Sequence, residues 1–141
     1  MNKYIVDDEL ELAHMALKEA GIATLNKDKV MSIDSGFRGQ ISSFGAAIMG
    51  GSVCSAIAFF SKQQGAAVDR SKLLKAIHYI LKEKKIIDSK EDLFQYAVNP
   101  KNKEKAKEDI LNATIALKLA MNLYHIEEKK KDVNNNGSKE E

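Results

Sequence analysis

Few residues in this chain of 141 have types and spacing that could do chemistry. Residues 45–52, Gly-Ala-Ala-Ile-Met-Gly-Gly-Ser, approach the phosphate-binding pattern Gly-x-x-x-x-Gly-Lys-Ser/Thr. Gly51 stands where that pattern needs the lysine that reaches the β- and γ-phosphates, and no run typical of a buried strand precedes the segment. We therefore interpret the segment as a break between two closely packed helices.

The other candidates for catalysis or metal binding are isolated from one another. His14, His78 and His125 fall on three different expected helices, and none has a second His or Cys at metal-ligand spacing. The chain has no Gly-x-Ser-x-Gly signature of an activated serine, and no pair of acidic residues stands out as a general acid and base. We therefore expect a protein that is not an enzyme and that takes no metal, cofactor or small-molecule substrate.

A basic segment is the positive signal for function. Residues 62–85 carry seven basic residues against two acidic ones, a net charge of +5, whereas the whole chain has a net charge of +2. On the helix expected there, Lys72, Lys75, Tyr79 and Lys82 share one face, opposite an apolar face. Lysines in a row beside an aromatic ring can follow a phosphate backbone, and a solvated amphipathic helix gives the same pattern. Spacing alone leaves both interpretations open.

Composition predicts an all-α protein. Hydrophobic residues make up 44% of the chain and charged residues 30%, Trp is absent and there is one Pro. Helix-forming residues such as Ala, Leu, Lys and Glu dominate, and long runs of β-branched and aromatic residues are missing. We expect a compact bundle of five or six helices in a single domain, residues 1–128, followed by a disordered polar tail, residues 129–141.

Capping residues and apolar periodicity place the first two helices. The first is expected to begin near Asp7 or Asp8, where acidic side chains favour the positive end of the helix dipole, and to end at Gly21. The second is expected to open at Asn26, a good N-cap, and to carry one long apolar face as far as Ile48.

The remaining helices follow from the same signals. The third, residues 53–62, is apolar almost all round and is predicted to be the buried central helix. Asp69 is expected to cap the fourth helix, and Ser89 with Asp92 resembles a capping box that opens a short fifth one. The last helix is expected to span residues 100–128, with an apolar face wide enough to meet several helices or a partner.

Residues 39–61 form an uncharged stretch that is long enough to span a bilayer. Gly, Ser and Gln dilute it, and neighbouring helices offer matching apolar faces, so a buried hairpin is the expectation and a membrane span the alternative. The single cysteine, Cys54, excludes an internal disulfide and fits a reducing cytoplasm. The N-terminus turns acidic at once, which is not typical of a secretory signal.

Four stretches, in this order, resemble the small subunit of the Cmr complex, the type III-B CRISPR effector that silences RNA. They are Phe-Arg-Gly-Gln-Ile-Ser-Ser-Phe-Gly-Ala-Ala-Ile (37–48), Ala-Ile-Ala-Phe-Phe-Ser-Lys (56–62), Arg-Ser-Lys-Leu-Leu (70–74) and Ala-Thr-Ile-Ala-Leu-Lys-Leu-Ala (113–120). The chain departs from the family at the glycine break, where many relatives have Asn-Gly-Leu, and at Asn122, where a basic residue is usual.

The resemblance implies a helical, non-catalytic subunit in the cytoplasm that takes part in antiviral defence. Copies of it would stack as a minor filament beside the backbone RAMP subunits and the large polymerase-like subunit. A basic surface would contact the guide RNA and the target RNA without reading bases. The expected phosphate contacts are Arg38, Lys62, Arg70, Lys72 and Lys75.

A stand-alone helical DNA-binding regulator is the second alternative. It would use the basic helix as its recognition element, which needs a turn and a supporting helix just before Arg70. The sequence instead predicts a loop over residues 63–69 and offers no base-reading Asn or Gln at the start of the helix.

Overall fold

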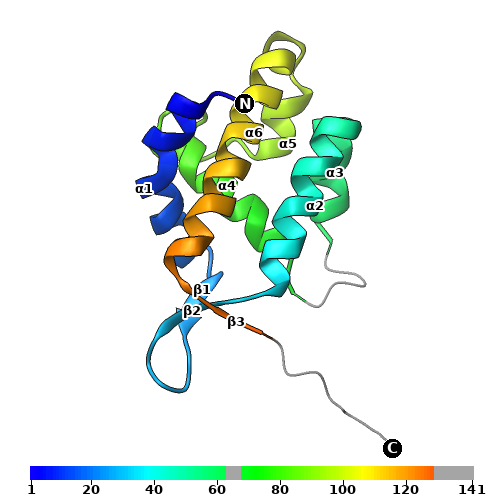
Figure 1. Cartoon of the computed structure of the whole chain (residues 1–141). Coiled ribbons are helices and arrows are strands. Elements are labelled where there is room, and N and C mark those ends of the chain that lie inside the picture. The colour runs from blue at the N-terminus through cyan, green and yellow to red at the C-terminus, as the bar shows by residue number, and fades with distance from the viewer. Residues whose placement is uncertain (63–67, 129–141) are drawn as a thin grey trace, which may run out of the picture.

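The computed structural model describes residues 1–62 and 68–128, which form a mostly helical bundle with a small sheet at one end (Figure 1). The predicted helical class is confirmed. The predicted tail, residues 129–141, and most of the predicted loop over 63–69 lie outside the described residues. The elements are α1 (Lys3–Glu19), β1 (Ala23–Leu25), β2 (Met31–Asp34), α2 (Gly36–Gly50), α3 (Val53–Phe60), α4 (Ser71–Glu83), α5 (Leu93–Val98), α6 (Lys103–Ala120) and β3 (His125–Glu127), with 3₁₀ turns at Pro100–Asn102 and Met121–Leu123.

The buried central helix of the bundle is α6, not residues 53–62. It contacts α1, α2, α4 and α5, and Figure 1 shows it between α1 and α2. By contrast, α3 buries one face and leaves Phe59 64% exposed. Small side chains along α6 let its neighbours approach closely, which a run of bulky residues would not. The buried residues of α6 are Ala106, Ile110, Leu111, Asn112, Ala113, Thr114, Ala116, Leu117 and Ala120.

Helix α1 begins at Lys3, earlier than the predicted start at Asp7 or Asp8. The side chain of Asn2 caps it by accepting hydrogen bonds from the backbone N–H groups of Tyr4 and Ile5. The predicted end is confirmed, because Gly21 follows the helix with φ of +77° and lies in the left-handed region.

Substitution of Gly21 by alanine should lower the free energy of unfolding by about 1 kcal/mol, because a Cβ is disfavoured in the left-handed region. Gly39 is the matched control. It lies inside α2, where an added Cβ meets nothing within 4 Å, so Gly39→Ala should raise the free energy of unfolding by about 0.5–1 kcal/mol. Urea denaturation measures both, and changes of the same sign would contradict the argument.

Residues 23–34 form a β-hairpin, so the prediction that a helix opens at Asn26 is wrong. The side chain of Asn26 accepts hydrogen bonds from the backbone N–H groups of Asp28 and Val30, and Lys29 adopts φ of +59°. Asn stabilises turns as readily as it caps helices, and the apolar spacing that follows it suits both a strand and a helix. Helix α2 therefore begins at Gly36, after the hairpin.

The last helix ends at Ala120, before the predicted end at residue 128, because the chain turns into β3. This strand pairs in parallel with β2, with Ile126 opposite Ile33. The ring of Tyr124 stacks on that of His14 at 4.5 Å between centroids, and its hydroxyl donates a hydrogen bond to the His14 carbonyl oxygen at 2.8 Å. These contacts tie the end of the chain to α1 and β2.

The predicted break after α2 is confirmed. Gly51 departs from helical geometry, and the Ser52 hydroxyl accepts a hydrogen bond from the Ser55 N–H at 3.0 Å to begin α3. Residues 39–61 thus form two helices that pack against each other. Among the described residues, the search for a helix with the length and hydropathy to cross a bilayer finds none.

The starts of α4 and α5 both differ from the prediction. The Asp69 carboxylate accepts hydrogen bonds from the N–H and the hydroxyl of Ser71, but the N-cap residue of α4 is Arg70, one residue after the predicted Asp69, and no side chain caps the helix there. The capping box of α5 begins three residues later than predicted: Asp92 is its N-cap and pairs with Gln95, and Ser89 takes no part in it.

Candidate nucleic-acid interface

The five predicted RNA contacts lie around the junction of α2, α3 and α4. At this junction α2 begins, α3 ends and α4 begins, near the end of the bundle that carries the sheet (Figure 1). Gly36 at the start of α2 lies against Val68, since a Cβ added there would be 3.0 Å from Val68 Cγ1. The start of α2 and the segment before α4, which are far apart in sequence, therefore meet at this junction.

Among the five predicted contacts, Arg70 is the one whose side chain is buried and hydrogen-bonded within the fold. It is only 8% exposed, and its guanidinium donates hydrogen bonds to the Lys62 carbonyl oxygen from Nη2 at 2.8 Å and from Nε at 3.2 Å. Nη2 also reaches the Phe59 carbonyl oxygen at 3.4 Å. Helix carbonyls at a C-terminus lack partners within the helix, so Arg70 caps α3 and joins it to α4.

Two aromatic rings shield the same guanidinium. Its Cζ lies 4.5 Å from the ring centroid of Phe59 and 5.2 Å from that of Phe60. With its donors directed at carbonyls and its face covered by rings, the Arg70 side chain has little surface to offer a phosphate. The sequence could not show this, because its partners are main-chain groups.

Lys72 is half-buried at the C-terminal end of α1. Its Nζ donates a hydrogen bond to the Gly21 carbonyl oxygen at 3.3 Å, which suits a cation near the negative end of a helix dipole. This single contact leaves two of the three ammonium donors for another ligand. The ammonium group of Lys72 can therefore hold α4 to the end of α1 and still bind an anion.

Arg38, Lys62 and Lys75 are the exposed cations of the set. Within residues 1–62 and 68–128, none of the three forms an ion pair, and neither does Lys72. Cations without an ion pair raise the potential around them and attract anions. Four of the predicted five, Arg38, Lys62, Lys72 and Lys75, are thus at least partly exposed and form no ion pair within the described residues, and we call these four residues the basic surface.

Asp69 is an acidic neighbour of Lys72 and Lys75. The hydrogen bond from the Ser71 hydroxyl lowers the pKa of its carboxyl, and the charges of Lys72 and Lys75 lower it further. Asp69 is therefore ionised at neutral pH and held by its hydrogen bonds from Ser71. Asp34, which accepts a hydrogen bond from the Gly36 N–H, and Glu19, which lines a hollow with Lys75, add negative charge here.

A polar hollow of about 190 Å³ continues the basic surface between α4 and the end of α1. Lys75, Tyr79 and Lys82 line it from α4, and Glu19 lines it from α1. Burial, Glu83 and Glu19 raise the pKa of Tyr79, so its hydroxyl keeps its proton at neutral pH and can donate. Lys82 was not among the five predicted contacts, although the spacing of Lys72, Lys75 and Tyr79 placed it on their face.

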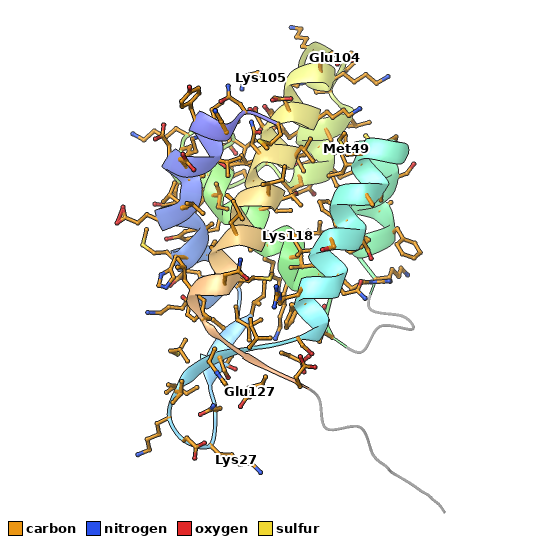
Figure 2. All side chains as sticks on the ribbon, viewed as in Figure 1. Lys27, Met49, Glu104, Lys105, Lys118 and Glu127 are labelled. Carbon is orange, nitrogen blue, oxygen red and sulfur yellow. The ribbon has the colours of Figure 1, made fainter. Side chains whose placement is uncertain are left out.

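An apolar groove lies elsewhere, between α2 and α6. Its volume is about 310 Å³, and small residues such as Gly45 and Ala46 form its α2 side. Figure 2 shows Met49 and Lys118 on the face of α2 and α6 where this groove lies. Lys118 is the one cation among its side chains, apart from the N-terminus at Met1, so the groove is not part of the basic surface.

Within the described residues, no group of three His, Cys, Asp or Glu side chains is placed to hold a metal ion. Comparisons with protein-family models, with curated proteins and with solved structures find no match. The arrangement of charge on the surface is therefore the main physical guide to what the chain binds.

Proposed function

We propose that the chain is a non-catalytic, RNA-contact subunit of a type III-B CRISPR effector complex. The observation that carries the proposal is that Arg38, Lys62, Lys72 and Lys75 are at least partly exposed and form no ion pair within the described residues. Point charges of this kind hold a phosphate backbone and read its shape without base preference. The guide RNA would supply the sequence specificity, and other subunits the chemistry.

The stretches that resemble the Cmr small subunit support the same assignment. Residues 37–48 form most of α2, 56–62 close α3, and 70–74 open α4, so three of the four stretches build the junction under the basic surface. The fourth, 113–120, forms the end of the central helix α6. In the proposed assembly, copies of the chain lie beside the backbone RAMP subunits and the large polymerase-like subunit.

The packing of α4 favours a phosphate surface over insertion into a DNA groove. Five residues of α4 are buried, and Lys72 is bonded to the end of α1. A recognition helix presents its first turns freely to base edges. Here the first turn of α4 is fixed on one side by the hydrogen bonds of Arg70 to the end of α3 and on the other by the hydrogen bond of Lys72 to the end of α1. This fixed position favours contact with a phosphate backbone over insertion into a groove.

Reversing the charge of the basic surface tests the RNA contact. The variant carries Glu at Arg38, Lys62, Lys72 and Lys75, and fluorescence anisotropy measures its affinity for single-stranded RNA as a function of salt. We expect weaker binding and a fall of about 3 in the slope of log affinity against log salt, since each lost phosphate contact removes about 0.7.

A matched control changes the net charge equally at exposed lysines away from the junction. Its four substitutions to Glu are at Lys27, Lys90, Lys101 and Lys107. Equal losses in the two variants would show general electrostatics and would count against the basic surface.

Affinity purification of a tagged copy from its own host tests the assembly. We expect RAMP-fold backbone subunits and guide RNAs with repeat-derived 5′ ends to be recovered with it. Recovery of the chain alone, from a host that expresses such a complex, would overturn the assignment to that complex.

A further inference from the structure

We propose that a hollow between α3, α4 and α5 receives the base of one unpaired RNA nucleotide, whose phosphate is held by Lys75 at the rim. The proposal rests on the proposed RNA contact and names a site within it. The volume of the hollow is about 310 Å³, at the lower end of the range of about 300–1,000 Å³ found for small-molecule sites.

Four of the residues that line the hollow are apolar, and one of these four is aromatic. Ile57 and Leu93 are buried, Leu74 is half-buried, and Phe94 is 44% exposed. A base that entered would cover this ring and the aliphatic side chains together. Stacking of one base on an aromatic side chain is worth about 1–3 kcal/mol, and it needs no particular base.

Among the polar groups of the hollow, Lys75 is the one suited to an anion. His78 Nε2 lies 2.7 Å from the Glu91 carbonyl oxygen, which can only accept, so this nitrogen carries the proton and the contact fixes the ring. The Ser61 hydroxyl donates to the Ile57 carbonyl oxygen at 2.8 Å. Lys75 is exposed and forms no ion pair within the described residues.

One carboxylate, that of Asp92, also lines the hollow. It accepts a hydrogen bond from the Gln95 N–H at 2.7 Å in the cap of α5. An anion would therefore settle toward Lys75 and away from the start of α5. A base can approach this carboxylate, because bases carry N–H donors on their edges.

Lys75 and His78 also line the polar hollow, which reaches Lys82 on the other side. Helix α4 thus separates an apolar hollow from a polar one, and Lys75 belongs to both. A nucleotide has the same division, with a flat apolar face and an anionic phosphate. An apolar peptide side chain would fill the first hollow only and would leave Lys75 without an anionic partner.

Adenosine monophosphate titrated into the whole chain tests the hollow directly. We expect chemical-shift changes at the methyl groups of Ile57, Leu74 and Leu93, and their loss in Phe94→Leu. Absence of these changes at millimolar nucleotide, or changes spread evenly over all methyl groups, would overturn the proposal.

Variants separate the base from the phosphate in RNA binding. Phe94→Leu should weaken binding about tenfold with an unchanged salt slope, because the lost interaction is stacking.

Lys75→Gln should lower the slope of log affinity against log salt by about 0.7, and Glu19→Gln should strengthen binding by removing the acid of the polar hollow. Tyr4→Leu, at an aromatic residue on α1 that is 71% exposed, is the matched control and should change nothing.

The outcomes distinguish this proposal from the proposed function. If reversal of the basic surface abolishes RNA binding while Phe94→Leu leaves it unchanged, the hollow is not a base site and the RNA contact stands. If the nucleotide shifts the methyl groups of the hollow but no effector subunits are recovered from the host, the site stands and the assembly does not.

Discussion

Replacement of Lys84 by methionine should lower the free energy of unfolding by about 3–5 kcal/mol at neutral pH, because it leaves a buried carboxylate without its partner. Lys84 Nζ lies 2.6 Å from Glu9 Oε2, and the Glu9 side chain is only 1% exposed. The second carboxylate oxygen, Oε1, has no hydrogen-bond partner among the described residues. Lys84 therefore supplies the one compensating contact that the structure gives this charge.

The size of the effect should depend on pH. Burial raises the pKa of Glu9, and the hydrogen bond and the charge of Lys84 lower it, so removal of Lys84 raises it further. A raised carboxyl pKa in the folded state contributes stability below the ordinary pKa, and this is lost as pH rises through the raised value. The destabilisation by Lys84→Met should thus shrink as the pH falls toward about 4.

Urea unfolding at several pH values measures this, and two variants serve as controls. Lys82→Met removes a lysine that lies 3.7 Å from Glu83 on the surface, and should cost less than about 1 kcal/mol. Glu9→Gln combined with Lys84→Met should recover most of the loss, because no buried charge remains. A cost below about 1 kcal/mol for Lys84→Met at pH 7 would contradict the argument.

Helices with one long apolar face could be predicted from the sequence. Phe37, Ile41, Phe44 and Ile48 recur at spacings of three or four, and all of them are buried against the core. A helix that covers a core must place its large apolar residues on one side, so local periodicity carries this information. The end of α1 could also be predicted from a local signal, because Gly21 takes a left-handed conformation that other residues avoid.

The sheet could not be predicted, because its pairing is not local. Strand β2 has Ile33 opposite Ile126 of β3, and these residues come from distant parts of the chain. The residues after Asn26 have a spacing that fits a helix, and tertiary pairing overrides that local preference. The end of α6 was misplaced for the same reason, because residues 125–127 are drawn into the strand.

The exposure of several basic residues could be predicted, but their contacts could not. A run of Lys and Arg marks a charged face, and Arg38, Lys62 and Lys75 are exposed. The sequence does not show which cation donates a hydrogen bond to a backbone carbonyl oxygen, because every residue carries such an oxygen and no side-chain type marks the partner. Among the described residues, Lys72 donates one hydrogen bond to a carbonyl oxygen and Arg70 donates three.

Arg70→Ala should lower the free energy of unfolding by about 3 kcal/mol. The substitution removes three hydrogen bonds from a charged donor and leaves the carbonyl oxygens of Lys62 and Phe59 without that partner at the end of α3. Hydrogen bonds from a charged group contribute about 1.5–3 kcal/mol, and the uncovered rings of Phe59 and Phe60 add to this. Lys62→Ala keeps the carbonyl and removes only an exposed side chain, so it should change stability by less than about 0.5 kcal/mol.

Arg70→Lys separates the structural role from RNA contact, because it keeps the positive charge. A single ammonium cannot reproduce the planar fork that reaches both carbonyls, so this variant should also lose stability. Its folded form should bind RNA with unchanged affinity and salt slope, since the exposed cations of the basic surface are intact. Unchanged stability together with weaker RNA binding would instead place Arg70 among the phosphate contacts. Urea unfolding and anisotropy on the same preparation decide between the two roles.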